Sequence, residues 1–236
     1  MKGLNRLLRL LDGLLNAVAV AAGMALLCIS VYSLVDNIRL YQGASDASLL
    51  TYKPALDAPM DNSQRVNEHQ AAWLYLYYTN IDYPVMQGED NYEYLNKDPY
   101  GEFKLSGSLF LDWRSSRDFS DSYSMIYGHH MEHGAMFGSL DYFTDPHYFE
   151  NHSQGRLITE DAVYDLRLFA VAYGDGDDPT LFDPHERAAG DVLAYLDQHA
   201  LIHMGCDPRS RILALSTCAG DTALSRLIVF CEMISH

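Results

Sequence analysis

The stretch ILALSTCAGDTALSRLIVF, residues 212–230, holds two apolar runs separated by a small, polar, glycine-containing loop. Runs of this length that are rich in Ile, Leu, Val and Phe and joined by such a loop predict two adjacent antiparallel strands. In that arrangement Cys218 ends the first strand and Arg226 begins the second. The stretch therefore predicts a β-sheet that carries a thiol and a guanidinium at one edge.

Short apolar runs of the same kind occur earlier in the chain, between clusters of Gly, Asp and Asn. They are IDYPVM, SGSLFLDW, YSMIYG, GRLITE and YDLRLFAVAYG. Without an alternation of strands and helices, these runs predict a mainly antiparallel β-barrel or sandwich. Helical spacing of apolar residues predicts a helix leading into a strand at residues 63–78 and a late helix at residues 184–203.

The N-terminal region contains the stretch GLLNAVAVAAGMALLCISVYSLV, residues 13–35, which has no charged side chain over 23 residues. A helix of this length exceeds the roughly 30 Å hydrocarbon core of a bilayer. We expect a cytoplasmic basic tail at residues 1–12, a transmembrane anchor at 13–35, an extracellular stalk at 36–62 and a folded domain at 63–236. The basic residues ahead of the apolar run, Lys2, Arg6 and Arg9, favour this orientation. A cleaved signal peptide is the alternative, although its apolar region is typically only about 7 to 15 residues long.

Charge and cysteine content narrow the class of protein. The formal net charge of -16 argues against nucleic acid as a partner, because phosphate binding requires clustered Lys and Arg. Cys28 falls in the apolar stretch, which leaves Cys206, Cys218 and Cys231 as an odd number for pairing. At least one of these thiols is therefore expected to stay free. The spacing of Cys206 and Cys231 does not decide between a disulfide and two thiols.

Three side chains have the chemistry of a thiol-dependent enzyme. Cys218 is a nucleophile candidate, because a strand end fixes its Cα while the following loop leaves the sulfur accessible. His129 follows a strand and Gly128, and an imidazole titrates near neutral pH. Arg226 is permanently charged and suits an oxyanion. Taken singly, each residue has an ordinary interpretation as a buried thiol, a loop histidine or a surface arginine.

Together with their flanking sequences, these residues resemble the sortase family, and specifically its class B. The matching blocks are NIDYPVMQGEDNYEYLNKD, GSLFLDWR, IYGHHM followed by MFG, LSTC, and the Arg eight residues later. They extend in the correct order from about residue 73 to residue 233. The resemblance implies a closed eight-stranded β-barrel with helices ahead of it and one helical insertion before the Cys strand. It implies no metal or other cofactor.

The resemblance also implies a cysteine transpeptidase located on the outer face of the cell membrane. Cys218, His129 and Arg226 match the catalytic residues, and His130 is then a neighbour. The residues expected to line the peptide groove are Asn91, Leu95 and Ser216, with Thr180 and Leu181 from the insertion. The implied reaction cleaves a C-terminal sorting signal after Thr through a thioester and transfers the secreted protein to an amine. That amine belongs to a cell-wall precursor or, alternatively, to a pilin lysine.

Other features of the sequence suggest other classes of protein. The cluster HHMEH, residues 129–133, suggests a metal-dependent hydrolase, but its spacing differs from the HExxH pattern of zinc sites on a helix. The acidic loop with Asp175, Asp177 and Asp178 lacks the glycine that a calcium loop of the EF-hand type requires. In papain-like enzymes Cys precedes His, whereas here His129 comes 89 residues before Cys218. A non-catalytic surface binding module is the remaining alternative.

Overall fold

The computed structural model describes residues 2–44, 47–218 and 225–235, which form two compact units, Met1–Gln42 and Gly43–His236. Nearly all of helix α1, Lys2–Ala44, belongs to the first unit. Its segment Leu8–Ile38 spans 31 residues with a mean hydropathy of 2.3. By length and composition, α1 is therefore able to cross a membrane.

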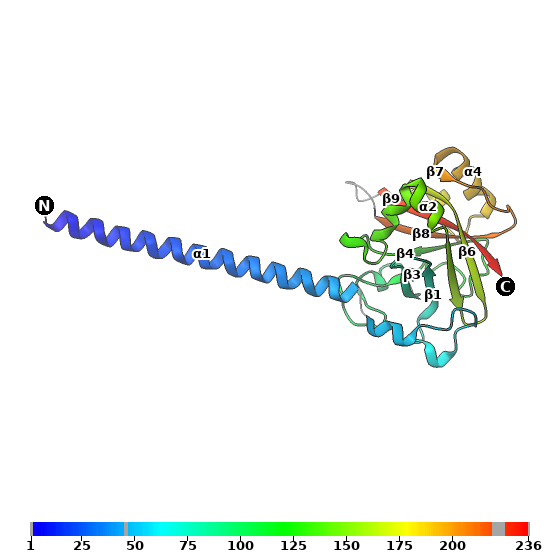
Figure 1. Cartoon of the computed structure of the whole chain (residues 1–236), viewed down its shortest axis with the longest axis horizontal. Helices are drawn as coiled ribbons and strands as arrows, with labels where there is room; N and C mark the ends of the chain where they lie inside the picture. Colours follow the sequence, from blue (N-terminus) through cyan, green and yellow to red (C-terminus); the bar gives the residue numbers. More distant parts are fainter. Residues whose placement is uncertain (1, 45–46, 219–224, 236) are drawn as a thin grey trace. The chain divides into compact units, whose positions relative to one another are not determined.

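A closed β-barrel forms the second unit (Figure 1). Among the described residues, eight strands are hydrogen-bonded in the order β5-β1-β2-β3-β4-β8-β9-β6, and the pairing of β6 with β5 closes the ring. These strands are β1 Gln70–Leu76, β2 Asp82–Met86, β3 Leu109–Leu111, β4 Tyr123–Tyr127, β5 Gln154–Thr159, β6 Val163–Asp175, β8 Arg211–Cys218 and β9 Ser225–Ser235. The predicted closed eight-stranded barrel is confirmed.

Two of the strand pairs in the ring, β2 with β3 and β4 with β8, are parallel, whereas the others are antiparallel. Parallel neighbours need long connections. The connection from β4 to β8 includes two further barrel strands and the helical insertion. The strand that bears Cys218 thus lies beside a strand from the middle of the domain.

Helices lie ahead of the barrel and between its strands. The 3-10 helices are η1 Ala47–Tyr52, η2 Asn62–Gln64, η3 Glu93–Asn96, η4 Glu132–Gly134 and η5 Gly138–Thr144. The α-helices of the barrel unit are α2 Pro146–Asn151, α3 Pro179–Phe182 and α4 Ala189–His199. The insertion between β6 and β8 holds α3, α4 and the short strand β7, Ala200–His203. It therefore contains the helical insertion expected before the Cys strand.

Two predicted helices differ from the structure. At residues 63–78 the predicted helix is reduced to the end of η2, whereas the strand that was expected to follow it is present as β1, which is covered on both faces. The late helix is shorter than residues 184–203, since it starts at Ala189 and Ala200–His203 pairs with β6 as β7. In both cases tertiary contacts override the local periodicity.

The segment between α1 and the barrel packs against the barrel. Leu49 and Met60 are buried in a cluster with Trp73, Ile158 and Val163. These apolar side chains reduce their exposure to water by contacting the barrel wall. The stretch expected to act as a stalk therefore belongs largely to the compact unit Gly43–His236.

Candidate active site

A pocket of about 500 Å³ opens where β4, β8 and β9 come together. The residues that line it come from distant parts of the chain. They are Asn91, Tyr92, Leu95, Phe110, Arg114, Tyr127, Gly128, His129, Gly176, Phe182, Ser216, Thr217 and Arg226. Five of the eight predicted site residues thus line one pocket, and the backbone of Cys218 directly follows the lining residue Thr217.

Strand register explains how His129, Cys218 and Arg226 come together. Tyr127 of β4 pairs with Ser216 of β8, and the Gly128 N–H donates to the Ser216 carbonyl at 3.1 Å. His129 therefore follows β4 at the level where β8 approaches its end. Across the other edge of β8, Cys218 pairs with Arg226 of β9. The side chain of Cys218 lies outside the described part of the structure.

His129 and its neighbour His130 have different partners. His129 Nε2 lies 2.7 Å from the Leu95 carbonyl oxygen, whereas His130 Nε2 lies 2.7 Å from Asp141 Oδ2. Because a carbonyl oxygen only accepts hydrogen bonds, Nε2 of His129 carries a proton. In the neutral ring, Nδ1 is then the nitrogen that accepts a proton. The two imidazoles do not converge on a shared point, as ligands of one metal ion would.

Arg226 is half-buried at the start of β9, and its Nη1 donates to the carbonyl oxygen of Ser225 at 3.1 Å. Gly174 of β6 pairs with Arg226 on the side away from Cys218. The neighbouring Gly176 lines the pocket. The backbone of Arg226 is thus fixed between two neighbouring strands, and its guanidinium is a cation at the border of the pocket.

The structure places the two insertion residues away from the pocket lining. Leu181 is fully buried in the core cluster that includes Tyr123 and Phe230, and Thr180 is half-buried as part of α3. The Leu181 carbonyl oxygen accepts a hydrogen bond from the Tyr123 hydroxyl at 2.8 Å. The insertion contributes Phe182 and Gly176 to the lining instead.

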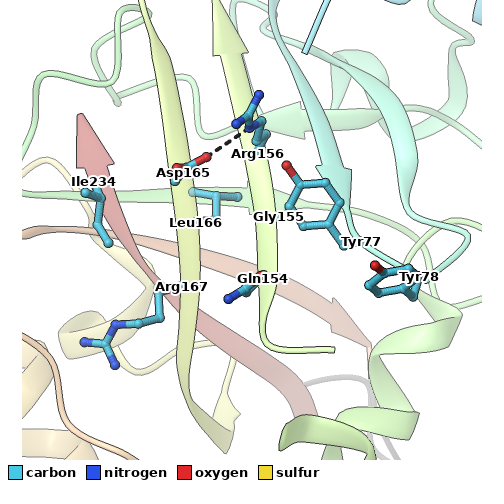
Figure 2. A pocket seen from close by; sticks show the side chains of 9 residues that line it. All are labelled: Tyr77, Tyr78, Gln154, Gly155, Arg156, Asp165, Leu166, Arg167 and Ile234. Carbon is cyan, nitrogen blue, oxygen red and sulfur yellow. Dashed lines mark hydrogen bonds and ion pairs between the residues drawn. The ribbon is translucent and has the colours of Figure 1, made fainter. Parts of the chain in front are cut away.

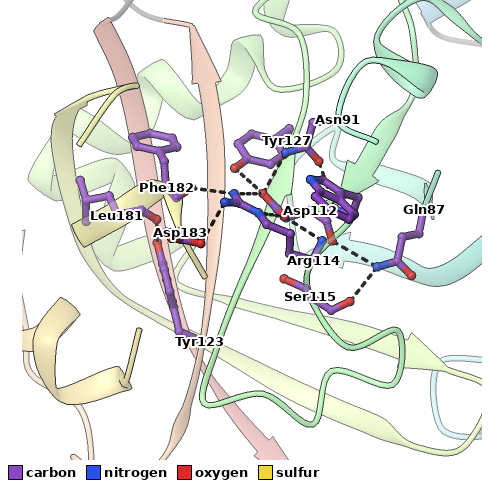
Figure 3. Close-up of polar contacts among 11 residues, drawn as sticks. Gln87, Asn91, Asp112, Arg114, Ser115, Tyr123, Tyr127, Leu181, Phe182 and Asp183 are labelled. Atoms are coloured by element: carbon purple, nitrogen blue, oxygen red, sulfur yellow. Dashed lines mark hydrogen bonds and ion pairs between the residues drawn. The ribbon is translucent and has the colours of Figure 1, made fainter. Parts of the chain in front are cut away.

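A buried carboxylate behind the pocket was not identified from the sequence. Asp112 is fully buried, and it accepts hydrogen bonds from Asn91 Nδ2, Tyr127 OH and the Arg114 guanidinium, each at 2.9 Å (Figure 3). Burial on its own raises the pKa of Asp112, but hydrogen bonds from Arg114 and Asn91 outweigh it, so the pKa lies below its ordinary value. The sequence signal for this buried carboxylate is an ionisable residue, Asp112, at the end of the apolar run in LFLDW.

A second pocket, also about 500 Å³, lies along β5 and β6 (Figure 2). Tyr77, Tyr78, Gln154 and Arg167 line it, and Arg156 Nε donates there to Asp165 Oδ1 at 2.9 Å. Among the described residues that form its wall there is neither cysteine nor histidine. Its chemistry therefore differs from that of the pocket that contains His129.

Comparison with known proteins identifies the family. A family model described as Sortase domain matches residues 74–234, and this chain therefore belongs to the sortase family. Sortase B of Listeria monocytogenes is 31% identical over 160 residues, which cover 66% of this chain and 65% of that protein. Class B is thus the branch of the family to which the chain is related, and homologues of this class are cysteine transpeptidases.

Solved structures agree with this assignment. A class B sortase of Streptococcus pyogenes, described as involved in pilus biogenesis, has a TM-score of 0.65 at 37% identity and covers 71% of this chain and 94% of its own. Sortase B of Staphylococcus aureus has a TM-score of 0.70 at 23% identity, with 85% and 99% coverage, and at this identity the likeness concerns the fold. The chain spans 65% of the length of the Listeria relative.

Proposed function

We propose that this protein is a membrane-anchored cysteine transpeptidase that cleaves a C-terminal sorting signal after Thr and joins the secreted protein to an amine. The observation that carries the proposal is the register of β8, which sets Cys218 opposite Arg226 and next to the pocket that contains His129. Membership of the sortase family supports the same chemistry.

In the first half of the reaction, the Cys218 thiolate attacks the Thr carbonyl carbon of the sorting signal. A carbon–sulfur bond forms, and the carbonyl oxygen becomes an oxyanion that Arg226 stabilises by hydrogen bonding. The carbon–nitrogen bond then breaks, and protonated His129 delivers its Nδ1 proton to the departing amine. The product is a thioester between Cys218 and the protein substrate.

In the second half, an incoming amine attacks the thioester carbon. The new amide bond forms as the carbon–sulfur bond breaks, so that the sulfur leaves as a thiolate. His129 accepts the proton that the amine loses, which restores the starting state. Leu95 holds the imidazole by its Nε2 throughout, and this contact keeps Nδ1 available for both proton transfers.

The acceptor proposed first is an amine of a cell-wall precursor. A pilin lysine is the second candidate, and the pilus-associated relative from Streptococcus pyogenes, at 37% identity, favours it. The apolar helix α1 supports attachment to the cell membrane, and the basic residues ahead of its apolar segment, Lys2, Arg6 and Arg9, support placement of the enzyme on the outer face. A tether of this kind raises the local concentration of enzyme and lipid-linked acceptor on one surface.

The test is ligation of a peptide with a sorting signal to an amine by the full chain and by Cys218→Ala. We expect the variant to lose activity by about three orders of magnitude or more. Cys206→Ala is the matched control, because Cys206 does not line the pocket and should be dispensable. Equal activity of Cys218→Ala and wild type would disprove the thiol mechanism. Loss of activity with a chelator would instead favour a metal-dependent hydrolase, and peptide binding without turnover by wild type would favour a binding module.

A further inference from the structure

We propose that Asp112 and Arg114 are positioning residues of the substrate pocket, which hold its α3 wall in place and thereby set the affinity for the peptide. The proposal rests on the function proposed above. Neither residue is assigned a role in bond formation, because Asp112 is fully buried and the guanidinium of Arg114 is bonded on two sides.

Asp112 connects two walls of the pocket from behind. Its Oδ2 accepts from Asn91 Nδ2, which belongs to the loop before η3, and from the hydroxyl of Tyr127 at the end of β4. Both donors belong to residues that line the pocket. The side-chain oxygen of Asn91 in turn accepts from the Trp113 N–H at 3.0 Å, which locks the amide orientation.

Arg114 extends this network to the third wall, α3. Its Nε and Nη2 face the Asp112 carboxylate at 2.9 Å, while Nη2 also donates to the Phe182 carbonyl oxygen at 2.7 Å and Nη1 to Asp183 Oδ1 at 2.9 Å (Figure 3). The planar guanidinium therefore fixes the distance between Asp112 and the end of α3. Phe182, which lines the pocket, also stacks on Tyr127 with ring centroids 6.5 Å apart.

The helix α3 depends on such contacts because it has only four residues. A helix this short is not stable on its own in water. Asp178 caps its start by accepting from the Thr180 N–H at 2.8 Å, and Leu181 anchors its middle in the core. At its end, the side chain that bonds the Phe182 carbonyl oxygen is that of Arg114. Removing the guanidinium is therefore expected to loosen the part of α3 that faces the peptide.

One other Asp-x-Arg pair among the described residues bonds internally in the same way, and it shows what this local motif does without the pocket. Asp207 and Arg209 form the same pattern, with Arg209 Nη2 3.0 Å from Asp207 Oδ2 and the Arg209 N–H 2.9 Å from Asp207 Oδ1. The Arg209 side chain is 89% exposed and that of Asp207 is 44% exposed, whereas the corresponding values are 28% for Arg114 and 0% for Asp112. An isolated pair at the surface contributes little to stability. The Asp112–Arg114 pair differs from the Asp207–Arg209 pair because Arg114 also bonds to Phe182 and Asp183.

The experiment compares wild type, Arg114→Gln, Asp183→Asn and the control Arg209→Gln, each as the full chain in detergent. Peptide turnover gives kcat and KM separately, and hydrogen exchange reports on residues 179–183. For Arg114→Gln we expect KM to rise about tenfold and exchange in this segment to accelerate about tenfold, while kcat stays within about twofold. Asp183→Asn, which leaves the Asp112–Arg114 bridge intact, should show a smaller change in the same direction. Arg209→Gln should behave as wild type.

The outcomes separate this proposal from the function it rests on. If Arg114→Gln and Asp183→Asn both leave KM and exchange in 179–183 unchanged, or if Arg114→Gln lowers kcat alone, the positioning role is wrong. If Arg114→Gln fails to fold, the response of Asp183→Asn decides. If wild type turns over no sorting-signal peptide while the exchange result holds, the proposed function fails and the mechanical role of Arg114 stands.

Discussion

The described cysteines differ in their surroundings, and this sets their reactivity. Cys231 is fully buried, and burial raises the pKa of its thiol well above the ordinary value. Burial and the nearby carboxylate of Glu232 raise the pKa of Cys206 to about 11. Both are free thiols, which answers the question that their spacing left open. Since the thiolate is the reactive form, neither is a competing nucleophile at neutral pH.

The ionisation of Asp112 makes stability depend on pH. Its pKa is lowered in the folded state, so the unfolded chain, with an ordinary Asp value of about 3.9, binds the proton more readily. The stabilisation is complete above about pH 3.9 and is lost as the pH falls through the lower, folded value. We expect urea unfolding between about pH 2 and pH 5 to show a weaker loss of stability on acidification in Asp112→Asn than in wild type.

At neutral pH the same substitution should lower the free energy of unfolding by about 2 kcal/mol, because the buried carboxylate loses its charge-assisted hydrogen bonds from Arg114, Asn91 and Tyr127 while Arg114 keeps its ion pair with Asp183. Asp207→Asn is the control, since its partner Arg209 is solvent-exposed. If the free energy of unfolding falls equally steeply with acidification in wild type and in Asp112→Asn, the assignment of this pH dependence to Asp112 is contradicted.

At the scale of the strand, the end of β4 sets the position of His129. A Cβ placed on Gly128 would lie 2.4 Å from Leu109 Cδ2 and 2.7 Å from Phe137 Cδ2. Contacts this short require the side chains of Leu109 and Phe137, which are both buried, or the strand end itself to move. The close packing of β3 and the segment before η5 against the strand end therefore favours glycine at position 128.

Gly128→Ala is expected to lower the free energy of unfolding by about 1 to 3 kcal/mol and to reduce peptide turnover, because His129 follows directly. Chemical denaturation and kinetics of the variant measure both effects. Gly190→Ala serves as the comparison: no atom lies within 4 Å of the added Cβ in α4, so the change should be neutral or slightly stabilising. An unchanged free energy of unfolding in Gly128→Ala would contradict this prediction, because it would mean that the neighbouring side chains move aside at little cost.

At the scale of the whole molecule, the chain divides into two compact units. The unit Met1–Gln42 holds the apolar helix, and the unit Gly43–His236 holds the barrel and the pocket. A basic N-terminal end with Lys2, Arg6 and Arg9 favours retention of that end in the cytoplasm. The proposed orientation then places the pocket outside the cell.

This orientation is testable with a membrane-impermeant thiol reagent on intact cells. In a chain whose own cysteines are replaced, Ala58→Cys should be labelled, because residue 58 is exposed on the barrel unit. Gly3→Cys should be labelled only after the cells are opened. Labelling of both sites in intact cells, or loss of the N-terminal segment from the mature chain, would contradict the anchored topology.

The sequence alone predicted the barrel and the grouping of its key residues, because strands and strand ends are local features. Apolar runs bounded by Gly, Asp and Asn mark strands, and the block order carried the family resemblance that predicts His129 beside Cys218. The tertiary structure decided the features that depend on neighbours distant in the chain. It reduced the helix expected ahead of β1 to the end of η2, and it buried Leu181 while exposing Phe182 to the pocket. It also linked Asp112 through Arg114 to the end of α3, since hydrogen bonds between segments about 70 residues apart have no periodic signature in the sequence.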